Sequence, residues 1–197
     1  MAELATSSRS SIVDRMLRAA RLEVALYEEV EADLTATNQA LLVVVIVAVA
    51  TGIGQALAAS TGGPATRGVV GPIIGGVLSA LIGWGVWSYV VYFVGTRFMG
   101  GTATYGEMLR TLGFAETPSV LLIFSFIPVL GGLISLVALV WRILAGFIAT
   151  RQALDIDNAK TLVTIVLGIV ALIVVLAVIG IVVGVIFGAG VAVGGLL

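Results

Sequence analysis

Long apolar runs alternate with short polar stretches along most of this chain. The longest run extends from Thr161 to Leu197 and contains no charged residue. A helix that crosses a hydrocarbon core of ~30 Å needs about 20 apolar residues, so this run is long enough to span a bilayer. The pattern predicts an integral membrane protein of the all-α class, in which the other apolar helices pack beside the last one.

The first 37 residues are much more polar and are predicted to form a cytoplasmic arm, residues 1–37. Apolar residues recur at helical spacing from Val13 to Leu34, and Ser11 with Asp14 has the pattern of a helix start. We therefore expect one amphipathic helix over about 12–34. Its first half is basic and its second half is acidic, and the acidic half is expected to face water or a partner. The candidate contacts in that half are Glu28, Glu29 and Glu31.

Residues 38–197 form the predicted membrane domain, a bundle of five transmembrane helices. The spans are expected at about 38–59, 69–96, 115–130, 132–152 and 160–187. Between the second and third spans, Thr104 and Glu107 form a capping box that begins a short interfacial helix ending near Gly113. The third span is short, so it must tilt, extend into the preceding segment or be shielded by its neighbours.

The segment from Pro118 to Thr150 allows a second interpretation, a single kinked helix followed by an interfacial piece. Lysine and arginine collect in cytoplasmic loops, which makes their distribution a test. With five spans and an inner N-terminus, the inner segments hold eight of these residues and the outer segments hold one, Arg67, while Arg142 lies within a span. Four spans give six against four. The count favours five spans, with the C-terminus outside.

Small residues recur every fourth position in two of the predicted spans. This spacing places them on one helix face, where they allow a second helix to approach closely in lipid. The candidate contact residues are Gly71, Gly75, Ser79 and Gly83 in the second span, and Gly180, Gly184 and Gly188 in the last.

Arg142 is the one charged residue that lies far from both ends of a predicted span. It lies about ten residues from either end of that helix, near the bilayer midplane, where a charge costs ~2.5–3.5 kcal/mol. No acidic residue is expected at a similar depth. Three interpretations remain open: the side chain extends to the inner interface and binds nearby carbonyls, it contacts another subunit, or it binds a lipid or substrate.

Composition excludes several kinds of site. The chain has no histidine and no cysteine, so the commonest general base and the thiolate metal ligands are missing. Asp155 and Asp157 are too few for a calcium loop and are better explained as caps of the last helix. A net charge of −1 gives no basic face for nucleic acid. We therefore expect no enzyme activity, no cofactor and no metal.

Two segments carry a resemblance to a known family. They are Gly101 to Leu121, GTATYGEMLRTLGFAETPSVL, and Trp141 to Leu162, WRILAGFIATRQALDIDNAKTL. The first resembles the Yip1-domain family of five-span membrane proteins in its Gly113-Phe114 pair and in the proline at 118 that begins the third span. The Asp-Leu-Tyr-Gly-Pro motif of eukaryotic members is absent, with only a Gly-Pro pair near that region. The resemblance implies the five-span architecture and a partner-binding role without catalysis.

These observations together predict a scaffold or accessory subunit in a membrane, expected to be the bacterial cytoplasmic membrane. Its expected partners are membrane lipids and other integral membrane proteins, in a larger heteromeric complex. The alternative is a small transporter or channel, although the spans offer few polar residues to line a path.

Overall fold

The computed structural model describes the backbone of residues 11–61 and 70–194, and the side-chain surroundings of residues 11–60 and 73–181. All regular elements in these ranges are helices, which confirms the all-α class. Four of the described helices are long and apolar enough to cross a membrane: α3 (Ala36–Thr61), α4 (Val70–Phe98), α6 (Leu130–Leu154) and α7 (Asn158–Gly194). The shorter elements are α1 (Ile12–Ala20), α2 (Val24–Ala32), α5 (Tyr105–Ala115) and the 3-10 helix η1 (Thr117–Phe124).

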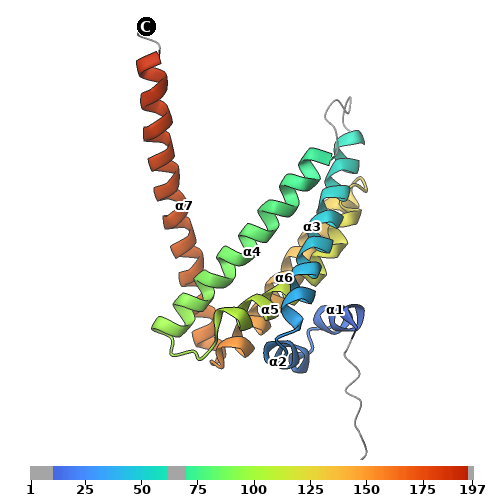
Figure 1. Ribbon diagram of the computed structural model, residues 1–197. Coiled ribbons are helices and arrows are strands. Elements are labelled where there is room, and N and C mark those ends of the chain that lie inside the picture. The colour runs from blue at the N-terminus through green and yellow to red at the C-terminus, as the bar shows by residue number, and fades with distance from the viewer. Residues whose placement is uncertain (1–10, 62–69, 195–197) are drawn as a thin grey trace, which may run out of the picture.

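The short helices gather at one end of the bundle, which we call the arm end (Figure 1). There α1, α2 and α5 lie across the ends of the long helices, beside the turn that joins α6 to α7. Helix α7 packs on α4 near this end, where Gly168 lies against the ring of Trp87 and the Thr161 and Thr164 side chains are buried. Farther along, α7 stands apart from the other helices (Figure 1). Most of its described apolar side chains are therefore left to contact lipid or another protein.

The arm contains two helices in place of the single amphipathic helix expected over about 12–34. Ser11 caps the first helix as predicted, since its Oγ accepts from the Asp14 amide at 3.1 Å. The helix then stops at a reversal where Leu22 has a φ of 60°. This reversal folds the acidic α2 back against the basic α1, so attraction between the two halves favours a hairpin over a continuous helix.

The segment expected as the third span, 115–130, is not a regular α-helix. It begins as η1 and continues through turns to Val129, whose φ is 67°. This segment runs along α3: Gly113 lies against Ala40 near the start of α3, and Gly54 lies against the Leu122 carbonyl near its far end. Helix α6 then returns toward the arm end, so η1 and α6 are separate elements and 118–150 is not one continuous helix, while the number of membrane crossings stays a prediction.

The other predicted helix starts are confirmed. Thr104 and Glu107 form the complete capping box at the start of α5, and Asp157 accepts from the Lys160 amide at 2.9 Å in the first turn of α7. Helix α5 was expected to lie in the membrane interface. In the structure most residues in its second half are buried against α3, α4 and α6. The buried core accordingly concentrates at the arm end, where α2 and α5 meet the long helices.

The contact between Gly54 and η1 leads to a stability prediction. A Cβ at residue 54 would collide with the Leu122 carbonyl and lie 2.8 Å from Ser125 Oγ, so Gly54→Ala should destabilise the fold by about 1–3 kcal/mol. Gly146→Ala is the matched control, because a Cβ there meets no atom within 4 Å. Thermal unfolding in detergent should show a lower midpoint for Gly54→Ala alone, and equal midpoints for the two variants would contradict this packing.

Candidate functional site

The arm is held together by a cluster of charges centred on Arg15. This side chain is only 5% exposed, and its guanidinium donates to Glu29 at 3.0 Å, Asp33 at 2.7 Å and Gln39 at 2.9 Å. Arg18 donates to the second oxygen of Glu29 at 2.6 Å. The cluster ties α1 to α2 and to the start of α3. Glu29, predicted as a partner contact, is thus bonded to two arginines of its own chain.

Hydrogen-bond partners lower the pKa values of two carboxylates in this cluster, Glu29 and Asp33. Burial alone would raise the pKa of Glu29, but hydrogen bonds and charge from Arg18 and Arg15 outweigh it and leave the pKa below its usual value. Hydrogen bonds from Thr35, and then from Arg15, lower the pKa of Asp33 to about 2 against the cost of burial. Both groups are therefore charged at neutral pH, and the arm presents fewer unpaired charges than its sequence indicates.

Arg110 links the arm to α5, a role that was not predicted from the sequence. Its guanidinium is buried and donates to the backbone carbonyls of Val30, at 2.9 Å, and Glu31 at the C-terminal end of α2. A cation at that position also interacts favourably with the helix dipole. The signal in the sequence is a single arginine among the apolar residues of a short helix.

Glu31 lies among other carboxylates at the arm end. Burial raises the pKa of Glu31 to about 7, and the charges of Asp155, Glu107 and Glu28 add to the shift, while Arg110 opposes it. Glu28 itself is exposed and accepts from Gln152 Nε2 of α6 at 2.9 Å. The carboxyl groups of α2, α5 and the α6–α7 turn are therefore brought together, although the described residues include no group of acidic side chains suited to hold a metal.

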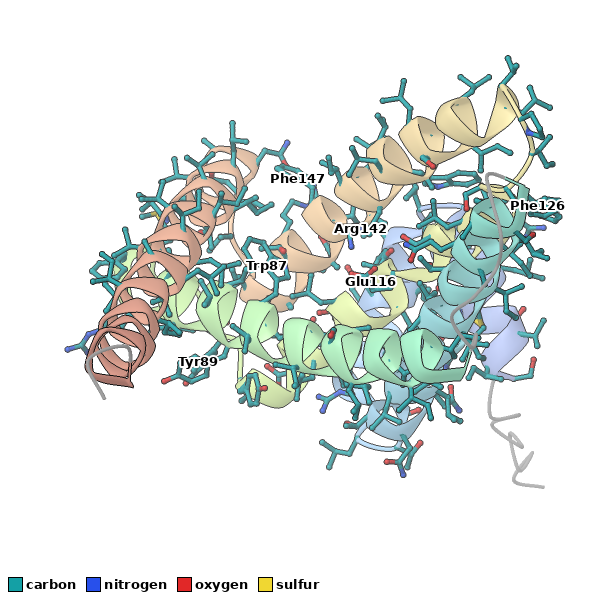
Figure 2. The ribbon with its side chains drawn as sticks, turned by 90° about the horizontal axis from the view of Figure 1, so that it is seen from above. Trp87, Tyr89, Glu116, Phe126, Arg142 and Phe147 are labelled. Carbon is teal, nitrogen blue, oxygen red and sulfur yellow. The ribbon has the colours of Figure 1, made fainter. Side chains whose placement is uncertain are left out.

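Arg142 has an acidic partner, contrary to the expectation that none lies at its depth. Its Nη1 lies 3.2 and 3.4 Å from the two carboxylate oxygens of Glu116, at the junction of α5 and η1. Figure 2 shows the two side chains pointing toward each other between α6 and α4. The partner was missed because Glu116 is the second residue of the predicted third span, 115–130, and so was placed at the membrane edge.

The pair also lies closer to the arm end than its position in α6 indicates. Trp141, the neighbour of Arg142, donates its indole N–H to the Ala20 carbonyl of α1 at 2.8 Å. Glu116 follows Gly113 by three residues, and Gly113 lies against Ala40 in the first turns of α3. Arg142 is therefore in the middle of its helix but near the level of the arm, because the arm and α5 pack along the half of α6 that is nearer the arm end.

The small-residue positions fall into two groups. On α4, Gly75, Ser79 and Gly83 are exposed, and a Cβ at either glycine would meet no atom within 4 Å. Gly180 of α7 is equally open. The side-chain surroundings of Gly71, Gly184 and Gly188 lie outside the described residues. The α4 positions therefore carry no packing within the described part of the chain.

The raised pKa of Glu31 predicts a pH dependence of stability. A carboxyl whose pKa rises from 4.5 to about 7 on folding stabilises the native state fully below pH 4.5, and this contribution is lost as the pH rises to 7. Glu31→Gln should therefore be more stable than wild type at pH 8 and equal to it at pH 4.5. The measurement is the unfolding midpoint across this range, with Asp14→Asn as a control in the same arm. If the unfolding midpoint of Glu31→Gln changed with pH as steeply as that of wild type, the raised pKa of Glu31 would be contradicted.

Comparison with known proteins agrees with this architecture. The model of the Yip1 domain matches residues 26–180, from within α2 to within α7. No curated protein and no solved structure matches the chain. The match covers both segments that carried the resemblance and most of the chain, and the structure supplies the apolar helices of a multi-pass membrane protein. The chain therefore belongs to the Yip1-domain family.

Proposed function

We propose that this protein is a non-enzymatic membrane scaffold or accessory subunit, which binds other integral membrane proteins through the exposed small-residue face of α4. The observation that carries the proposal is the contrast between glycines. Gly54, Gly95, Gly113 and Gly131 each lie against another segment of the chain, where a side chain would collide. Among the described residues, a Cβ at Gly75 or Gly83 would meet no atom within 4 Å, and Ser79 between them is exposed. Small residues bring helices together in lipid, so an uncovered row of them favours contact with a second protein.

We also propose that the chain crosses the membrane five times, with the arm in the cytoplasm of a bacterial cell. In addition to the four long helices, the segment from η1 to Val129 would cross the membrane as the third span in chain order. Between the levels of Ala40 and Gly54, α3 rises about 21 Å at 1.5 Å per residue. A 3-10 helix rises about 2.0 Å per residue, so the short segment beside α3 covers nearly the same height with fewer residues. The excess of lysine and arginine in the segments at the arm end supports the cytoplasmic orientation.

Native mass spectrometry of the protein extracted gently from its own membrane tests the scaffold proposal. We expect a heteromeric complex of fixed stoichiometry. Gly75→Leu and Gly83→Leu should each release the partner, because leucine prevents close helix approach, while leaving the chain folded. Gly132→Leu is the matched control, a glycine on α6 that also has open space around it. Recovery of the wild-type chain alone or as a homo-oligomer would contradict the proposal.

Single-cysteine labelling tests the topology. The chain has no native cysteine, so Ser10→Cys and Asn158→Cys can be labelled in an unmodified background. Five crossings place both on the same side of the membrane, and Thr66→Cys, between α3 and α4, should react from the opposite side. Labelling of residues 10 and 158 from opposite sides would rule out five crossings.

A further inference from the structure

The guanidinium of Arg142 has hydrogen-bond donors that no described residue uses. An arginine carries five N–H groups in one plane. Arg142 directs Nη1 to Glu116, whereas its Nε and Nη2 have no partner in the described part of the chain, and 48% of the side chain is exposed. By comparison, Arg15 places all three of its nitrogens on side-chain oxygens. Arg142 is thus held in position by one contact and remains open to a second.

The surface around this side chain is apolar. Leu139 and Ile143, which lie to one side of Arg142 on the surface of α6, are exposed, whereas Ala138 and Ala145 to its other side are buried. Leaving N–H donors of a cation without partners beside such a surface costs several kcal/mol in an apolar medium. No described residue supplies acceptors for these donors, so they are open to water or to another molecule.

The depth of the Arg142–Glu116 pair limits which molecules can supply hydrogen-bond acceptors for Arg142. The bond from Trp141 to Ala20, and the position of Glu116 just beyond the first turns of α3, place the pair near the level of the arm. A long arginine side chain at this level reaches the boundary between acyl chains and headgroups. The phosphate of a lipid in that leaflet is therefore within reach, and it matches the planar fork of a guanidinium.

Glu116 determines which headgroup fits. Its carboxylate is 26% exposed, and both oxygens receive only Arg142 Nη1 within the described residues. A purely anionic headgroup would place its negative charge beside this carboxylate. A zwitterionic headgroup places a phosphate and an ammonium a few ångströms apart and complements the fixed pair of opposite charges.

We propose that Arg142 and Glu116 together bind the headgroup of phosphatidylethanolamine. Nε and Nη2 of Arg142 donate to the phosphate, the ammonium donates to the Glu116 carboxylate, and the acyl chains lie on the apolar face of α6. This site is separate from the small-residue face of α4, and its test needs no protein partner, so failure of the scaffold proposal would leave it intact.

The experiment uses the purified full chain in detergent, mixed with equal amounts of phosphatidylethanolamine, phosphatidylcholine and phosphatidylglycerol, and counts retained lipids by native mass spectrometry. We expect one retained phosphatidylethanolamine. Phosphatidylcholine should bind less, because its quaternary ammonium cannot donate a hydrogen bond to Glu116. Arg142→Gln should reduce retention roughly tenfold, the loss expected for a charge-assisted hydrogen bond. Arg151→Gln is the control, an arginine of the same helix that bonds to Gln152 and Asn158.

Glu116→Gln separates recognition from folding. It keeps the phosphate contact and should retain lipid, but lose the preference for phosphatidylethanolamine over phosphatidylglycerol. Equal retention of all three lipids by wild type, or unchanged retention in Arg142→Gln, would overturn the proposal. Displacement by glycerophosphoethanolamine at a concentration similar to the lipid's would identify a soluble ligand instead. A dimer that dissociates in Arg142→Gln would show that a second copy occupies the site.

Discussion

The short passage between α5 and α6 constrains the rest of the bundle. The chain runs along α3 from the level of Ala40, beside Gly113, to that of Gly54, beside Leu122, and a regular α-helix would use more residues for that rise. The backbone of the 3-10 helix lies close to α3, so Gly54 faces the Leu122 carbonyl oxygen, with Ser125 Oγ beside it. At the far end, Gly131 lies against the Ser125 carbonyl, where the chain reverses into α6. Glycine is required at these two positions because backbone meets backbone there.

The charges of the chain are divided between neutralised and open groups. Arg15 and Arg18 are bonded to the carboxylates of α2, so these two arginines of the basic half are not free to bind anionic lipids. Arg110 is bonded to the end of α2, so it also faces inward. These bonds join the arm to α3 and α5 and make it part of the bundle. Among the other charged groups, the carboxylates around Glu31 oppose one another, and Arg142 is half exposed.

Much of this architecture could be predicted from the pattern of residues, because apolar length and helix caps are local properties. The long helices and the starts of α5 and α7 were found in this way, within a few residues. The arm hairpin was missed because periodicity continues through Leu22, and only the attraction between distant charges favours the reversal. Glu116 was missed because depth was counted along each helix, whereas packing of the arm against α6 sets the level of Arg142. Both errors concern contacts between residues far apart in the sequence, which no local pattern contains.

The two proposed surfaces differ in the physical force that would fill them. The face of α4 offers only shape: without side chains at Gly75 and Gly83, another helix can approach closely, and van der Waals contact is the main gain. The Arg142–Glu116 pair offers charge in an apolar setting, where each unused hydrogen bond is costly and a matched headgroup removes that cost. The two surfaces consist of different residues, Gly75 and Gly83 of α4 in one and Arg142 with Glu116 in the other. A membrane scaffold built in this way could hold a protein on one helix and a lipid on another, with the packed arm end keeping the two helices in fixed relation.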